Sequence, residues 1–207
     1  MSLRRLGGWV VGLVLAAAPP ALLTAQVSIQ PSIGLRYTTT IVHDSIVTPF
    51  DVRPAMAPAL AVTATSRTAG PWAAQATLDF STSTLERHDA GGATADLGRV
   101  STLAVTVGVR RSLPAGLAAK ARVGGVKYLP ADDTGIFRSG AGGVLALAGA
   151  ALSYAPPGAV AGAWRFGVEA RYDMHRFITP ALRAEGFTSG RVVHRIALAL
   201  EAGWGAP

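Results

Sequence analysis

The chain has 207 residues, a length that suits a single domain. It contains no cysteine, which excludes disulfide bonds, thiolate metal sites and thiol nucleophiles. Its formal net charge is +7, but the arginines are spread along the chain rather than gathered in one basic tract. Because an export signal also precedes them, we expect no nucleic-acid partner.

The beginning of the chain has the layout of a secretory signal peptide. Arg4 and Arg5 precede an uncharged apolar run over residues 6–18, and the segment Leu22–Ala25 ends in a small residue suited to cleavage. The apolar run is too short to span a bilayer, which needs about 20 residues. We therefore predict a signal peptide over residues 1–25 and one mature domain over residues 26–207.

Apolar and polar residues then alternate with a period of two, the pattern of β-strands with one apolar face. In Trp164–His175, for example, Trp164, Phe166 and Val168 alternate with Arg165, Gly167 and Glu169. In chain order, the eight alternating segments are Val27–Thr38, Met56–Thr65, Trp72–Ser81, Thr102–Arg110, Leu117–Leu129, Gly142–Tyr154, Trp164–His175 and Val192–Trp204. The phase of the fifth segment is ambiguous near Lys127 and Tyr128, where a β-bulge would explain it. The sixth is too uniformly small and apolar to assign its faces.

The connections between these segments alternate strictly between short and long. The short ones are compact and rich in Gly and Pro: Arg67–Pro71, Arg111–Gly116 and the region of Pro156–Gly158. The long ones are more polar: Thr39–Pro54, Thr84–Gly98, Pro130–Gly140 and Arg176–Gly190. Bacterial membrane barrels have short periplasmic turns and longer extracellular loops, so this order favours a barrel whose apolar faces point outward to lipid.

Aromatic residues lie near both ends of the predicted strands, where membrane–water interfaces favour them. Those next to short turns are Trp72, Tyr154, Trp164 and Trp204; those next to long loops are Tyr37, Tyr172 and, less clearly, Tyr128. Together with the alternation, they predict an all-β fold, an eight-stranded antiparallel up-and-down transmembrane β-barrel.

The opposite faces of the strands would line the barrel interior. The predicted interior polar network consists of Arg36, Asp79, Arg110, Lys120, Arg122, Glu169, Arg171, Asp173, Arg195 and Glu201. An eight-stranded barrel is only wide enough for side chains to fill, and buried charges are costly unless paired. We therefore expect a packed plug of ion pairs. The alternative is an ion path whose net positive lining gives a mild anion preference.

With these features, the mature chain resembles the small eight-stranded outer-membrane β-barrel family, which includes the transmembrane domain of outer membrane protein A and outer membrane protein X. The resemblance implies an assembly signal in the last strand, formed here by Ile196, Leu198, Leu200, Ala202 and Trp204. Family members usually end on the aromatic residue, whereas this chain continues over residues 205–207. The resemblance rests on strand count, loop alternation and this terminal pattern.

No catalytic or metal-binding motif stands out. His43, Asp44 and Ser45 supply the residue types of a hydrolase triad, but adjacent residues on an extended chain point in alternate directions and cannot form one. The pairs His88/Asp89, Asp132/Asp133 and Asp173/His175 lack a recognised ligand spacing. We expect no enzymatic activity, no cofactor and no metal.

The predicted function is that of an integral outer-membrane protein of a Gram-negative cell envelope, with a structural or surface-interaction role carried by its extracellular loops. Its expected partners are outer-membrane lipid, lipopolysaccharide and the outer-membrane assembly machinery; no residue identifies an extracellular partner. Two alternatives stay open: a small porin-like passive pore, and a soluble periplasmic lipocalin-like barrel that binds an apolar ligand.

Overall fold

A computed structural model describes residues 27–44, 49–66, 70–133, 135–161 and 164–204. The predicted signal peptide lies outside these residues, as do Gln26, Ser45, the tail 205–207 and the side chain of Trp204. Among the described residues, no helix has the length and apolar character needed to cross a membrane.

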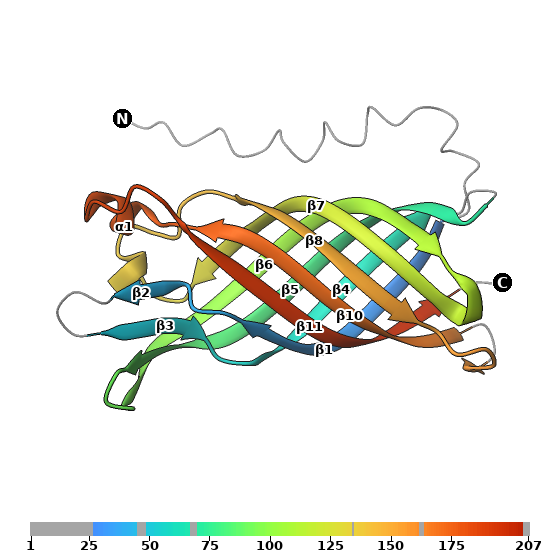
Figure 1. The fold of residues 1–207 in the computed structure, drawn as a ribbon, viewed down its shortest axis with the longest axis horizontal. Helices are drawn as coiled ribbons and strands as arrows, with labels where there is room; N and C mark the ends of the chain where they lie inside the picture. The colour runs from blue at the N-terminus through green and yellow to red at the C-terminus, as the bar shows by residue number, and fades with distance from the viewer. Residues whose placement is uncertain (1–26, 45–48, 67–69, 134, 162–163, 205–207) are drawn as a thin grey trace, which may run out of the picture.

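Eight antiparallel strands form a closed ring, which confirms the predicted fold class (Figure 1). In ring order they are β1 (Val27–Thr38), β11 (Arg191–Trp204), β10 (Trp164–Phe177), β8 (Leu145–Tyr154), β7 (Leu117–Pro130), β6 (Thr94–Ser112), β5 (Trp72–Asp89) and β4 (Ala57–Ser66). The pairing of β1 with β11 closes the ring, and Leu35 lies opposite Leu198 there. Closure removes the unpaired strand edges that an open sheet exposes.

The two ends of the barrel differ (Figure 1). At the turn end, short connections join β4 to β5, β6 to β7 and β8 to β10. The turn between β6 and β7 contains Gly116 at φ +79°, and a Cβ there would lie 2.2 Å from the carbonyl oxygen of Ala155, so only glycine fits. At the loop end, all four long connections gather.

The long connections contain more regular structure than the sequence suggests. The first includes the strands β2 (Val42–Asp44) and β3 (Phe50–Pro54), and β3 extends the sheet by pairing with β5. The third includes a 3-10 turn at Gly135–Phe137 and the fourth the short helix α1 (Pro180–Ala184). The prediction that Thr84–Gly98 forms a long loop is wrong. The paired strands β5 and β6 continue through most of this segment as a hairpin, and only residues 90–93 connect them.

Side chains alternate between the two sides of the barrel wall, as the sequence predicts. In β10, Phe166, Val168 and Tyr172 are exposed outside, whereas Glu169 and Arg171 are buried inside. The bulge considered near Tyr128 is absent from β7, whose pairing with β6 keeps one register from Ala118 to Pro130. The phase is ambiguous in sequence because Lys127 points outward and Tyr128 inward, the reverse of the usual polarity.

Candidate functional site: the filled interior of the barrel

The middle of the barrel interior holds a layer of interlocked charges, which we call the charged layer. Its basic members are Arg36, Lys120, Arg122, Arg171 and Arg195, and its acidic members are Asp79, Glu169, Asp173 and Glu201. These nine side chains come from β1, β5, β7, β10 and β11, so the ion pairs connect different parts of the barrel wall across the lumen.

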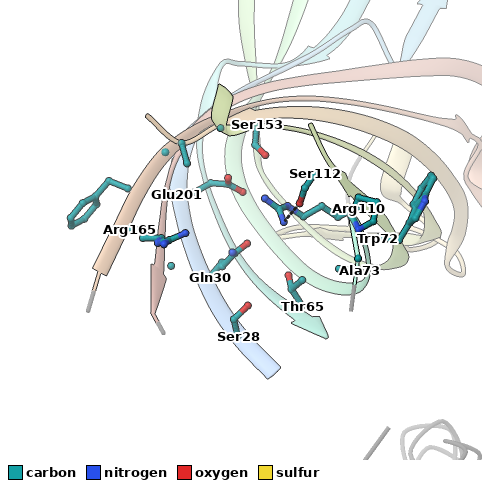
Figure 2. A pocket seen from close by; sticks show the side chains of 17 residues that line it. Ser28, Gln30, Thr65, Trp72, Ala73, Arg110, Ser112, Ser153, Arg165 and Glu201 are labelled. Carbon is teal, nitrogen blue, oxygen red and sulfur yellow. Dashed lines mark hydrogen bonds between the residues drawn. The ribbon is translucent and has the colours of Figure 1, made fainter. Parts of the chain in front are cut away.

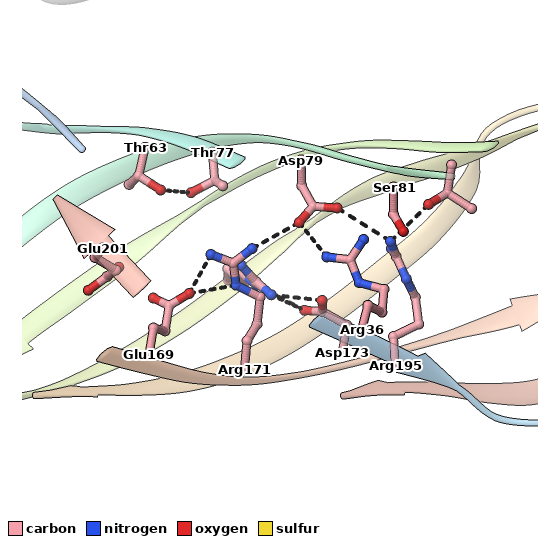
Figure 3. Close-up of polar contacts among 12 residues, drawn as sticks. Arg36, Thr63, Thr77, Asp79, Ser81, Glu169, Arg171, Asp173, Arg195 and Glu201 are labelled. Atoms are coloured by element: carbon pink, nitrogen blue, oxygen red, sulfur yellow. Dashed lines mark hydrogen bonds and ion pairs between the residues drawn. The ribbon is translucent and has the colours of Figure 1, made fainter. Parts of the chain in front are cut away.

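Asp79 is the centre of one half of the charged layer (Figure 3). Its carboxylate forms an ion pair with Arg36 and accepts from Arg171 Nη1 at 2.9 Å. Arg195 Nη2 lies 3.4 Å from the other carboxylate oxygen. Because one carboxylate serves three guanidinium groups from three strands, Asp79 ties β5 to β1, β10 and β11.

Lys120 and Glu169 organise the other half of the charged layer. Lys120 Nζ lies 2.5 Å from Glu169 Oε2 and 2.7 Å from Glu201 Oε1, and Arg171 Nε donates to Glu169 Oε1 at 2.6 Å. Arg171 therefore joins the two halves, since it contacts both Glu169 and Asp79. The cavity left beside Lys120 and Arg171 measures only about 10 Å³.

A separate fork-shaped contact joins Arg122 on β7 to Asp173 on β10. Arg122 donates from Nε to Asp173 Oδ1 at 2.9 Å and from Nη2 to Oδ2 at 2.7 Å, a bidentate arrangement that fixes both side chains. Gly149 on the intervening strand β8 makes room for it. A Cβ on Gly149 would lie 2.0 Å from Asp173 Oδ1, so any larger residue would displace the carboxylate.

Toward the loop end the interior is apolar. We call this cluster the apolar cap: Ile41, Val42, Val52, Leu85, Val100, Ala104, Val126, Tyr128, Phe137, Leu147, Phe177, Leu182 and Val193. It includes inward side chains of the barrel strands and residues of the long connections. The rings of Tyr128 and Phe177 meet edge to face with centroids 4.9 Å apart. Tyr128 is 2% exposed, so its assignment to the interfacial aromatics is wrong.

Toward the turn end the interior opens into a polar vestibule of about 310 Å³ (Figure 2). Its side chains include Gln30, Arg110, Arg165 and Glu201. Arg110 donates to Ser112 at 3.2 Å and lines the vestibule. Of the ten predicted interior residues, Arg110 is the one placed apart from the nine of the charged layer.

Apart from Trp204, whose side chain is outside the described part of the chain, the residues assigned to the outer surface lie on the outward faces of their strands. Tyr37, Trp72, Tyr154, Trp164 and Tyr172 are between 36% and 53% exposed, and Trp204 pairs through its backbone with Trp164. In the last strand, Ile196, Leu198 and Leu200 point outward at more than half exposure, and Ala202 shares their register. Their role as an assembly signal stays a prediction.

The histidine residues that could suggest catalysis or metal binding have partners within the chain. His43 Nδ1 lies 2.8 Å from Asp51 Oδ1, and His88 Nε2 lies 3.1 Å from Glu86 Oε2. His175 Nε2 lies 2.9 Å from the Tyr128 hydroxyl. Within the described ranges, no group of three or more acidic or histidine side chains could hold a metal ion.

A comparison with protein-family models found no match, and a comparison with curated proteins found none either. Solved structures do match the whole barrel. The outer membrane protein Ail of Yersinia pestis is 14% identical with a TM-score of 0.50, covering 86% of this chain and 99% of that one. The chain has the fold of the small outer-membrane β-barrels.

Two further barrels give the same result. Neisserial surface protein A is 12% identical with a TM-score of 0.51, covering 86% of this chain and 97% of that one. The outer membrane protein OprG of Pseudomonas aeruginosa is 10% identical with a TM-score of 0.50, covering 87% and 96%. At such low identity the likeness is one of fold, which confirms the predicted resemblance and leaves the role to be argued from this chain's own residues.

Proposed function

We propose that the protein is an integral outer-membrane β-barrel with a closed lumen, and that its structured loop end serves a structural or surface-interaction role. By analogy with bacterial membrane barrels, whose short turns lie in the periplasm, the turn end would face the periplasm and the loop end the outside of the cell. The fold shared with outer-membrane proteins supports the location. Lipid and lipopolysaccharide would surround the barrel, and the assembly machinery would insert it.

The observation that carries the proposal is the apolar outer surface. Leu198 is 65% exposed, Leu200 63% and Ile33 58%. Every strand of the ring carries large exposed apolar side chains of this kind. Soluble monomers rarely expose contiguous apolar patches of more than a few hundred Å². A lipocalin-like barrel would need Phe166 and Val168 inside and Glu169 outside, and the structure has the reverse.

The filled interior argues against the passive pore. The charged layer leaves cavities of about 10 Å³, each enough for roughly one water molecule, and the apolar cap closes the loop end beyond it. A hydrated ion would have to separate several buried ion pairs and then cross an apolar core. The vestibule is therefore a recess open toward the turn end rather than the mouth of a channel.

At the loop end, the long connections form an ordered surface that is packed against the barrel. The β5–β6 hairpin and β3 extend the sheet, and the apolar cap packs the connections onto the barrel. Thr179 Oγ1 donates to the carbonyl of Ile136 at 2.7 Å, and Arg138 Nη2 lies 2.6 Å from Glu185 Oε1. These contacts join the third and fourth long connections, which favours recognition by a preformed surface.

Membrane fractionation tests the location. The wild-type protein should stay in the membrane fraction after high-salt and urea washes, dissolve in detergent and migrate differently on gels when unboiled. Leu198→Arg places a charge on the outward face, which costs about 2–4 kcal/mol near the bilayer midplane, and should abolish the heat-sensitive folded band. The control Ala199→Ser, next to it on the inward face, should retain that band. Release of the wild type by high salt alone would overturn the proposal.

A further inference from the structure

The charged layer carries more positive than negative charge. Its five basic side chains face four carboxylates, and Asp79 alone serves Arg36, Arg171 and Arg195. The other three carboxylates are occupied by Lys120, Arg122 and Arg171. Among the described residues, one buried positive charge is thus left without a counter-charge, and a buried charge of this kind is costly.

The excess is concentrated at Arg36 and Arg195, the most deeply buried cations of the layer at 3% and 1% exposure. Arg36 Nε and Nη1 and Arg195 Nη1 are buried and have no hydrogen-bond partner within the described part of the chain. Guanidinium groups only donate hydrogen bonds. What these three nitrogen atoms lack is an acceptor, and the charge balance requires that the acceptor be negative.

A small cavity lies beside Arg36, between the charged layer and the apolar cap. Its volume is about 10 Å³, close to that of one water-sized particle. Its polar lining is made of Arg36, Thr38, Ser81, Ser83, Thr102 and Tyr128, with no carboxylate among them. The hydroxyl of Thr102 accepts from Arg195 Nη2 at 3.1 Å, so its own proton is free to donate elsewhere.

We propose that this cavity binds one small monovalent anion of the halide class, with chloride as the natural occupant. Arg36 supplies the charge and the unpartnered N–H donors, and the Thr102 hydroxyl supplies a further donor. A water molecule would accept the hydrogen bonds but leave the positive charge uncompensated. Phosphate or a carboxylate compound is too large for the cavity. The anion completes the charge balance of the layer and acts as a structural ion.

The first test is crystallographic and uses bromide as the probe. The unfolded protein is refolded into detergent in a bromide buffer, so that the ion is available while the interior assembles, and the crystals are measured at the bromine absorption edge. We expect an anomalous peak within hydrogen-bond distance of Arg36. Anomalous peaks confined to the outer surface, or no peak at all, would overturn the proposal.

The second test measures thermal unfolding while chloride replaces gluconate at constant ionic strength. The melting temperature of the wild type should rise by about 3–5 °C for every tenfold increase in chloride above the dissociation constant. Arg36→Met balances the layer without an ion and should lose this dependence. Arg183→Gln removes an equal charge from the exposed surface of α1 and should keep it.

If Arg36→Met does not fold, Thr102→Val provides the comparison. It removes one hydroxyl donor from the cavity while the cation remains, and should move the chloride response to higher concentrations. A wild-type melting temperature that is indifferent to chloride would contradict the anion site, as would an Arg36→Met or Thr102→Val response identical to that of the wild type.

Discussion

The interior of this barrel has two filled regions that are built from opposite chemistry. The charged layer is held by ion pairs that radiate from Asp79, Lys120 and Glu169, whereas the apolar cap is held by packed rings and aliphatic side chains. The inward faces of the same strands contribute to both, and the long connections add to the apolar cap. In β7, Lys120 and Arg122 belong to the charged layer, and Val126 and Tyr128 to the apolar cap.

This difference shows that the polarity of the side chains on the outward and inward faces of a strand is determined by different surroundings. The outward face is mainly apolar on every strand of the ring, which suits the single lipid environment that we propose for it. The inward face changes with depth, because it meets ion-pairing side chains in the middle and the packed loop connections at one end. Stability should therefore depend on salt bridges in one region and on packing density in the other.

Asp79→Asn should have the largest effect, because it removes the one carboxylate among the described residues that three guanidinium groups share. Breaking a buried ion pair from one side costs about 3–5 kcal/mol, since the remaining charges stay buried without compensation. Urea unfolding in detergent or lipid vesicles measures the loss. Asp133→Asn makes the same chemical change on the exposed surface and should leave the unfolding midpoint unchanged. Equal midpoints for both variants would mean that the charged layer contributes little.

Val193→Ala tests the apolar cap. Val193 is completely buried there, and loss of its methyl groups should cost about 2 kcal/mol from lost burial and the resulting cavity. Its neighbour Val192 is 44% exposed on the outward face, where lipid fills the space that a smaller side chain leaves. Val192→Ala should therefore cost clearly less in the same unfolding measurement. The reverse order would contradict the assignment of the two faces.

Gly149→Ala should cost about 1–3 kcal/mol, because an added methyl group would lie 2.0 Å from Asp173 Oδ1, displacing that carboxylate from Arg122, and 2.6 Å from the backbone carbonyl oxygen of Tyr172. Gly143, just before β8, has open space around its missing Cβ, so Gly143→Ala should be neutral. Adding Arg122→Met to Gly149→Ala should yield less than the sum of the two single losses, because both variants disrupt one contact. Strict additivity would show that Gly149 acts through another neighbour.

The fold was predictable because a period of two, repeated in eight segments, gives each strand one apolar and one polar face whatever the inner contacts are. The faces of Trp164–His175 follow from the sequence in this way. The individual ion pairs do not, because Arg36 and Asp79 are 43 positions apart and meet only through the ring order and the register of the strands.

The apolar cap was missed for a physical reason. Sequence alternation distinguishes polar from apolar faces, and at Val126–Leu129 the inward residues Val126 and Tyr128 are as apolar as outward ones. The ambiguous phase in that segment was the available signal: an alternation that fades near a loop indicates an interior that has become apolar. The extended β5–β6 hairpin was missed because polar residues on both faces of Thr84–Gly98 resemble a loop, although its strands pair beyond the barrel.

Single-channel recording in a planar bilayer tests the closed lumen most directly. With the charged layer and the apolar cap in place, the inserted wild-type protein should give no discrete conductance steps over a range of voltages and salt concentrations. Insertion is verified on the same sample by the heat-sensitive folded band. Reproducible steps, especially steps with anion preference, would show an open path past Arg36 and Asp79 and would support the pore instead.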